Sequence, residues 1–363
     1  MSDFKEHQLW DACASGHLEL VKFLARDPGV NVNWIGFEKG DTPLHRACRL
    51  GHAEVVKFLL QHPNVDLNAG NAKKGTPFSL ACQEDHREVV SLLLADVRID
   101  VNTPMNEGAT PFYIACQENH IEVVTMLLAD PRIDVNEADV DGVTPLFMAC
   151  QNGHKEVVSL LMSDLRIDLN KSDSSECTPL WFVSQQGHLR VAQVILVSGR
   201  NVDTKAKSIP GIALWNNKTA AEIGRFQEIR AREAESAEVY ARRRRNGPLI
   251  AALLDSFDAN PATTRQQLRE LPELRDPFIS DLFALVIFLC EELLTVRAED
   301  SALSFHKAAR FFQIAQALPM ELQMMLCNRV FGAGKNNVLT QHSEPAFKKL
   351  GKLLALSQRS EER

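Results

Sequence analysis

Cysteine and histidine recur four residues apart in the first half of the chain, and these residue types can bind zinc or carry out thiol catalysis. The pairs are Cys13/His17, Cys48/His52, Cys82/His86, Cys116/His120 and Cys150/His154. Zinc needs about four ligands at one point, and a catalytic pair occurs once, whereas this sequence spaces its pairs evenly. We therefore predict no metal site and no catalytic residues here, and interpret each cysteine as a small buried apolar residue.

Other sequence features give little support for catalysis. The segment FGAGKNN, residues 331–337, resembles a phosphate loop, but Arg329 and Asn336 stand where that pattern needs a glycine and a serine or threonine. Beyond residue 246 the only histidines are His306 and His342, so general acid-base chemistry has few groups to use. We predict a protein that is not an enzyme and has no cofactor; an enzyme with its site in the C-terminal region remains the alternative.

Charge and hydropathy exclude further classes. Residues 1–200 carry 17 Lys and Arg against 27 Asp and Glu, which argues against nucleic-acid binding because phosphate contacts need clustered cations. The longest apolar run, residues 282–290, has nine residues, whereas a membrane span needs about 20. The N-terminus lacks a secretory pattern, and cysteines in such a chain are usually reduced. We expect a cytoplasmic or nuclear protein that binds neither nucleic acid nor membrane.

A repeat with a 34-residue step supplies the elements that position the Cys-His pairs. Its copies are TPLHRAC from Thr42, TPFSLAC from Thr76, TPFYIAC from Thr110, TPLFMAC from Thr144 and TPLWFVS from Thr178, with HQLWDAC from His7 as an earlier copy in the same register. A period of this length is typical of stacked modules, each too small to bury its own apolar face.

Each copy predicts two helices followed by an extended loop. Thr caps the first helix and Pro occupies its first turn. Gly, Asp85 or Asn119 follows about ten residues later, and these residue types tolerate the left-handed conformation that ends a helix. The segments EVVKFLL, EVVSLLL, EVVTMLL and EVVSLLM then predict a second helix with Glu in its first turn, where negative charge suits the helix dipole.

The elements T-P-L-x-x-A-C, G-H-x-E-V-V and D-V-N resemble ankyrin repeats over about residues 5–205. This resemblance implies an all-α fold: an ankyrin-repeat α-solenoid followed by a small α-helical domain. We expect residues 1–240 to hold about six clear repeats and a degenerate one near Thr219, residues 241–247 to form a basic linker, residues 248–357 to form the helical domain, and residues 358–363 to be a disordered tail.

The family resemblance also implies which residues bind a partner, since ankyrin repeats hold proteins on the concave face of their first helices and on their turn tips. The concave positions, which are the helix-end positions of these first helices, are Arg49, Leu50, Gln83, Glu84, Gln117, Glu118, Gln151, Asn152, Gln185 and Gln186. The turn-tip positions are Glu38, Lys39, Asp41, Asn106, Glu107, Asp141 and Val143. The glutamines recur in register, so a framework role for them stays open.

Three aromatic residues are further candidates for partner contact. Tyr113, Phe147 and Trp181 occupy the position of His45 in the family pattern, and large aromatics anchor interfaces where they are partly exposed. The competing interpretation is packing between repeats. Because only Leu44-His45 keeps the family's Leu-His, we expect the hydrogen bonds of that histidine to be lost in the other repeats.

Two segments suggest more specific hypotheses. Arg242 to Arg245 is either a nuclear-import or anion-binding patch or the cationic end of a charged helix. The segment LPMELQMML, residues 318–326, is similar to the opening of an F-box motif, which implies docking to a ubiquitin-ligase scaffold; an ordinary helix with a proline start is the alternative. The sequence thus predicts a protein-protein interaction scaffold or adaptor, with a ubiquitin-ligase adaptor as the second hypothesis.

Overall fold

The computed structural model of the protein describes residues 2–36, 39–208, 217–225 and 236–271. The chain divides into two compact units, and residues 1–266 form the first, which carries the repeats. The predicted helical domain beyond residue 271, the tail, the F-box-like segment, the FGAGKNN segment, His306 and His342 lie outside the described residues.

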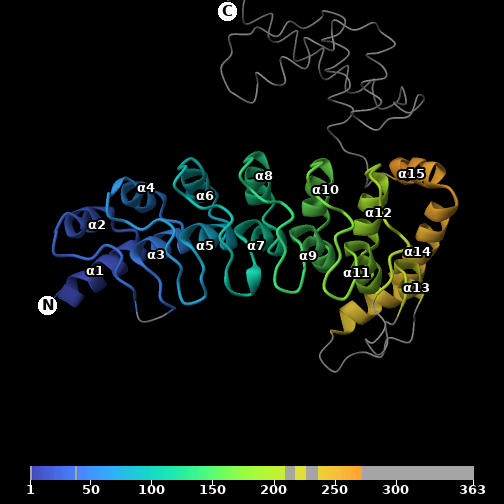
Figure 1. The fold of residues 1–363 in the computed structure, drawn as a ribbon, viewed down its shortest axis with the longest axis horizontal. Coiled ribbons are helices and arrows are strands. Elements are labelled where there is room, and N and C mark those ends of the chain that lie inside the picture. The colour runs from blue at the N-terminus through green and yellow to red at the C-terminus, as the bar shows by residue number, and fades with distance from the viewer. Residues whose placement is uncertain (1, 37–38, 209–216, 226–235, 272–363) are drawn as a thin grey trace, which may run out of the picture. The chain divides into compact units, whose positions relative to one another are not determined.

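The helices of the repeats, α1 to α12, form two rows (Figure 1). The first helices of the repeats are α1 (Ser2–Ser15), α3 (Pro43–Arg49), α5 (Pro77–Gln83), α7 (Pro111–Gln117), α9 (Pro145–Asn152) and α11 (Pro179–Gln186). The second helices are α2 (Leu18–Ala25), α4 (Ala53–Gln61), α6 (Arg87–Leu94), α8 (Ile121–Ala129), α10 (Lys155–Ser163) and α12 (Leu189–Val197). A helical solenoid was predicted and is confirmed.

Little other regular structure occurs in the described part of the chain. A single 3-10 turn, η1 (Asn106–Gly108), lies at one loop tip. Lys207 and Thr219 form an isolated antiparallel bridge, and no strand is present among the described residues. None of the helices in the described ranges has the length and apolar content that a bilayer span needs.

Helix boundaries follow the sequence signals. The Thr residues at positions 42, 76, 110, 144 and 178 each accept the backbone N–H three residues on, with Pro in the first turn. The stop residues have positive φ, including Asp85 at 56° and Asn119 at 61° beside Gly51 at 74°. Local backbone chemistry therefore sets where each first helix begins and ends.

The core is continuous along the array because each repeat buries its apolar residues against its neighbours. The largest fully buried side chains include Phe78, Phe112, Phe147, Leu59, Leu93, Leu127 and Leu161. They come from the same few positions of successive repeats. Stability of such an array arises from the interfaces between neighbouring repeats as well as from the repeats themselves.

An asparagine ladder ties the extended loops together. Asn68, the Asn of the first complete D-x-N element, donates to the Arg98 carbonyl at 2.8 Å and accepts the Asp100 N–H at 2.9 Å. Asn33, Asn102, Asn136 and Asn170 make the equivalent two bonds. The recurring Asn therefore satisfies backbone groups of the following repeat that have no other partner in a loop.

A second ladder is made by arginines and points backward along the chain. Arg98 donates to the Leu60 carbonyl at the end of α4, and Arg132 donates to Leu94 at the end of α6. Arg166 donates likewise to Leu128. Each of these arginines also pairs with the Asp two residues before it. A cation at a helix C-terminus satisfies free carbonyls and suits the helix dipole.

The array ends in a helix pair that departs from the repeat pattern. Thr219 and Glu222 form reciprocal capping bonds at the start of α13 (Ala220–Arg225). Gly224 of α13 and Gly247 of α14 (Ala237–Ala259) approach so closely that a Cβ on either would lie within 3 Å of the other's carbonyl oxygen. Helix α15 (Pro261–Glu270) follows α14 directly.

The predicted basic linker is corrected by this arrangement. Residues 241–247 lie inside α14, which continues to Ala259, so they neither separate two segments nor end a helix. The reason is tertiary: α14 packs against α11, α12 and α13, and this contact carries the helix past Gly247 and Pro248. Arg242 and Arg243 of the arginine run take part in that contact, whereas Arg244 and Arg245 are exposed.

Candidate partner-binding surface

The loop tips are joined in a row by backbone hydrogen bonds. The Ala72 N–H donates to Lys39, that of Asn106 to Lys73, that of Val140 to Glu107 and that of Ser174 to Asp141, all at 2.8–3.0 Å. Within the tips, the side-chain oxygens of Asn71, Asp139 and Asp173 accept the N–H groups two and four residues on. The exposed side chains of the tips are therefore held at regular intervals.

Four of the five histidines of the Cys-His ladder, and His188 at the equivalent position of the next repeat, bond to backbone rather than to a shared ligand, whereas Nδ1 of His17 lies 3.3 Å from the Ser15 hydroxyl. Nε2 of His86 lies 2.8 Å from the Arg49 carbonyl oxygen of the preceding repeat. His52, His120, His154 and His188 contact Ala14, Gln83, Gln117 and Gln151 in the same way. Burial lowers the pKa of His188 to about 4, with Arg242 contributing next, so its ring is neutral at pH 7. The described residues hold no metal-binding cluster.

The six described cysteines are free and buried, and burial raises the pKa of Cys13 to about 12. Because thiolate is the reactive form, we predict that Ellman's reagent at pH 8 labels none of these six until the chain is unfolded. Labelling followed by peptide mass spectrometry measures this, and Ser91→Cys, at an exposed position, supplies a reactive control. Rapid native labelling of any of the six contradicts the burial.

At the position of His45, tryptophan side chains in two other repeats also donate hydrogen bonds to the next repeat. His45 accepts the Thr42 N–H at Nδ1 and therefore donates from Nε2 to the Gly75 carbonyl, at 2.8 Å. The indole N–H groups of Trp10 and Trp181 donate to Asp41 and Lys218 at 2.8 and 2.9 Å. In each case the acceptor immediately precedes the cap of the next helix.

The three candidate aromatics are consequently corrected. Tyr113, Phe147 and Trp181 are at most 5% exposed, so they pack between repeats and present no surface to a partner. Tyr113 donates its hydroxyl to Asp139 at 3.0 Å, and burial together with that carboxylate raises the Tyr113 pKa. The expectation that the histidine's bonding would be lost is wrong for Tyr113 and Trp181, whose O–H and N–H groups bond to the next repeat. It holds for Phe147, whose side chain has no polar hydrogen, and for Ser79, which donates to Thr76 of its own repeat.

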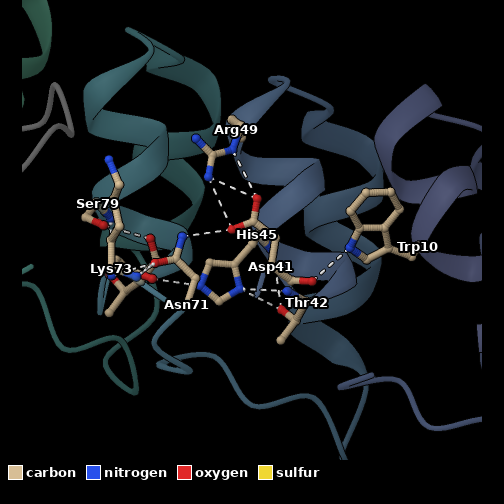
Figure 2. Close-up of polar contacts among 10 residues, drawn as sticks. Trp10, Asp41, Thr42, His45, Arg49, Asn71, Lys73 and Ser79 are labelled. Atoms are coloured by element: carbon tan, nitrogen blue, oxygen red, sulfur yellow. Dashed lines mark hydrogen bonds and ion pairs between the residues drawn. The ribbon is translucent and has the colours of Figure 1, made fainter. Parts of the chain in front are cut away.

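Arg49 belongs to a buried polar cluster (Figure 2). Its guanidinium pairs with Asp41 at 3.0 Å, and Asn71 donates to the same carboxylate at 2.8 Å. Asp41 lies just before α3, whereas Arg49 ends that helix, so the arginine reaches back along α3 toward the loop tip. In this repeat the end of α3 and the residue before its cap are therefore joined by an ion pair, which leaves Arg49 largely occupied.

The remaining helix-end predictions divide by exposure. The exposed residues are Leu50, Glu84, Glu118 and Asn152, and at a tip Glu107. The half-buried residues are Gln83, Gln117 and Gln151, whose backbone carbonyls accept hydrogen bonds from the histidines. Asp41 is buried, Val143 is half-buried, and Glu38 lies outside the described residues. Tip residues Lys73, Lys74, Val140 and Glu176 are exposed and were missed, although aligning the loops between successive Thr-Pro elements would have found them.

Helix α14 covers the last predicted positions, Gln185 and Gln186. Arg242 donates to the Gln186 carbonyl at 3.0 Å and Arg243 to its side-chain oxygen at 2.7 Å. Asn246 donates to the Gly187 carbonyl. Gln185 is buried. In earlier repeats a histidine of the next repeat lies at this end of the first helix and bonds to the carbonyl equivalent to that of Gln185. Here α14 occupies that place, with Gln185 buried and Gln186 half-buried and bonded to two arginines.

Charge is divided along the exposed tips. Lys39, Lys73 and Lys74 occupy the tips before α3 and α5, whereas Glu107, Asp141 and Glu176 occupy the tips before α7, α9 and α11. The later tips also hold Asp139 and Asp173, and burial raises the pKa of Asp173 with smaller contributions from Asp141 and Asp139. The surface is thus basic near its N-terminal end and acidic farther along.

The comparisons with known proteins agree with this architecture. The family model for ankyrin repeats matches three times, over residues 2–71, 64–139 and 132–206. Among solved structures, the ankyrin repeat domain of Bcl-3, described as a unique member of the IkappaB protein family, is similar with a TM-score of 0.53 and 23% sequence identity. That match covers 64% of this chain and 96% of the Bcl-3 chain. No curated protein matches this chain.

The three family matches together extend over more than half of the chain. They coincide with the capped first helices, the left-handed stops and the ladders between repeats that the structure shows. The chain therefore belongs to the ankyrin-repeat family.

Proposed function

We propose that the chain is an interaction scaffold that holds a protein partner along one face of its ankyrin array. The recognition surface consists of the exposed tip and helix-end side chains Lys39, Lys73, Lys74, Asn106, Glu107, Val140, Asp141, Glu176, Leu50, Glu84, Glu118 and Asn152. The observation that carries the proposal is that recurring residues and exposed residues have different contacts. Residues that recur from repeat to repeat are engaged in bonds between repeats, whereas these residues are exposed and most of them differ between repeats. Asn152 also donates to the Gln117 carbonyl of the preceding repeat.

The charge division suggests the chemistry of the partner. Complementary charges steer association and fix the register of a complex. An acidic segment of the partner suits the tips that carry Lys39, Lys73 and Lys74, and a basic segment suits those that carry Glu107, Asp141 and Glu176. Binding along several tips needs an elongated partner surface, because the tips belong to successive repeats.

Charge reversal tests this proposal. A partner is first recovered with the wild-type chain, and its dissociation constant is measured. Two double variants are then compared: Lys73→Glu with Lys74→Glu, and separately Glu107→Lys with Asp141→Lys. Each is expected to weaken binding by about tenfold or more and to reduce the salt dependence of binding. Lys57→Glu with Lys205→Glu, and Glu54→Lys with Glu156→Lys, are matched controls at exposed positions outside the recognition surface.

Two outcomes would contradict the proposal. Equal affinity of the reversed variants and the controls would place the partner elsewhere on the chain. Weakening by the control variants alone would place it on the second helices. Circular dichroism and thermal unfolding of each variant show whether the fold is kept, which exposed substitutions are expected to allow.

A further inference from the structure

The first described repeat leaves uncovered an apolar face whose equivalents in later repeats are covered. Leu20 on α2 is 41% exposed. Its equivalents in register, Val55, Val89, Val123, Val157 and Val191, are at most 1% exposed. In those repeats the second helix packs against the second helix before it, as in the α2-α4 and α4-α6 pairs. Leu20 therefore has the residue type that later repeats bury, but at a position that no other helix covers among the described residues.

Phe23 extends the same face. It is 75% exposed, while its equivalents Phe58, Leu92, Met126 and Leu160 are half-buried. Phe4 of α1 is exposed as well, and Figure 1 shows α1 and α2 together at this end of the array. Terminal repeats of soluble arrays normally carry a polar outer face. A cluster of exposed large apolar residues is typical of an interaction site.

The charges around this face have both signs. A surface depression is lined by Phe23 and Leu24 and by charged side chains that include Lys5, Arg26 and Asp27. Lys5 pairs with Asp27 at 2.7 Å and Lys22 with Glu19 at 2.8 Å, all four at exposed or partly exposed positions. A surface that offers a protruding aromatic, a depression beside it and balanced charges can be complementary to itself.

We propose that this end face, defined by Phe4, Leu20 and Phe23 with the surrounding charges, joins two copies of the chain in a twofold dimer. In a twofold interface the same patch occurs on both sides, so Phe23 of each copy meets the depression of the other and cations of one copy meet anions of the other. The contact extends the helix stacking of the array across the axis. It leaves the recognition surface of both copies open.

Sedimentation velocity of the full chain between about 1 and 100 µM tests the dimer. A dimer with a micromolar dissociation constant dissociates at the low end of this range and forms at the high end. The wild type is expected to shift from monomer to dimer over this range. Leu20→Glu with Phe23→Glu should raise the dissociation constant at least about 100-fold, because each buried charge occurs twice in a twofold interface. Phe23→Ser alone is a milder variant and should weaken the dimer less.

Leu165→Glu, at an exposed position in the fifth repeat, is the control and should leave the dimer intact. A wild type that stays monomeric at 100 µM, a dimer that survives in both end-face variants, or a dimer equally weakened by Leu165→Glu would each overturn the proposal. Thermal unfolding of the variants at low concentration should match that of the wild-type monomer, since the substituted side chains are exposed in one copy.

Discussion

Leu161→Ala is expected to lower the free energy of unfolding by about 2 to 5 kcal/mol, the cost of removing a fully buried leucine and leaving a cavity. Leu161 on α10 has no exposed surface and lies in the continuous core between repeats. Its loss weakens packing within the fifth repeat and at its interfaces. Urea unfolding followed by circular dichroism measures the change through the midpoint and slope of the transition.

Leu165→Ala provides a matched control for this prediction. Leu165 lies four residues farther along the same repeat but is 85% exposed, so the same chemical change should alter the free energy of unfolding by no more than about 0.5 kcal/mol. Equal destabilisation by the two substitutions would show that α10 does not bury the face described above. A larger effect at Leu165 would require its contact with a partner or another segment.

Asp41→Ala is expected to lower the free energy of unfolding by about 3 kcal/mol, near the lower end of the range for breaking a buried ion pair. Asp41 is buried and accepts hydrogen bonds from both Arg49 and Asn71 (Figure 2). Its removal leaves the guanidinium and the amide without their acceptor. We expect a value below the upper end of that range because the Arg49 side chain is 16% exposed, so water can solvate its guanidinium once Asp41 is removed.

A double-mutant cycle separates this pair from general destabilisation. Arg49→Ala in the Asp41→Ala background should cost less than Arg49→Ala in the wild type, since the partner is already missing. Asp141→Ala, at an exposed tip, is the control and should change the free energy of unfolding by no more than about 0.5 kcal/mol. Additive effects of the Asp41 and Arg49 substitutions would show that the two side chains do not stabilise one another.

These two predictions concern different levels of the fold. Leu161 belongs to the recurring apolar pattern, and its burial was predictable from its equivalents at Leu93 and Leu127. Asp41 stands where the other copies have Gly75, Ala109, Val143 and Cys177, so no recurrence marked it. It was predicted to lie at an exposed turn tip, whereas the structure places it in the buried cluster with Arg49.

The sequence alone determined the local elements of this protein. Thr-Pro starts and left-handed stops act through backbone groups within a few residues, so the boundaries at Thr110 and Asn119 follow from neighbouring letters. The repeat then determined the solenoid, since equal modules with apolar faces bury them only against one another. Burial of Cys82 and Cys116 followed from the same periodicity.

Only the tertiary structure decided which unrepeated residues face solvent and where the array ends. Tyr113, Phe147 and Trp181 were ambiguous because an aromatic side chain can anchor a partner or fill the space between repeats, and the loop of the next repeat settles that choice. Gln186 was withdrawn by Arg243, which is 57 residues away in sequence. Contacts at such separations depend on how whole helices stack, and short-range sequence signals carry no information about them.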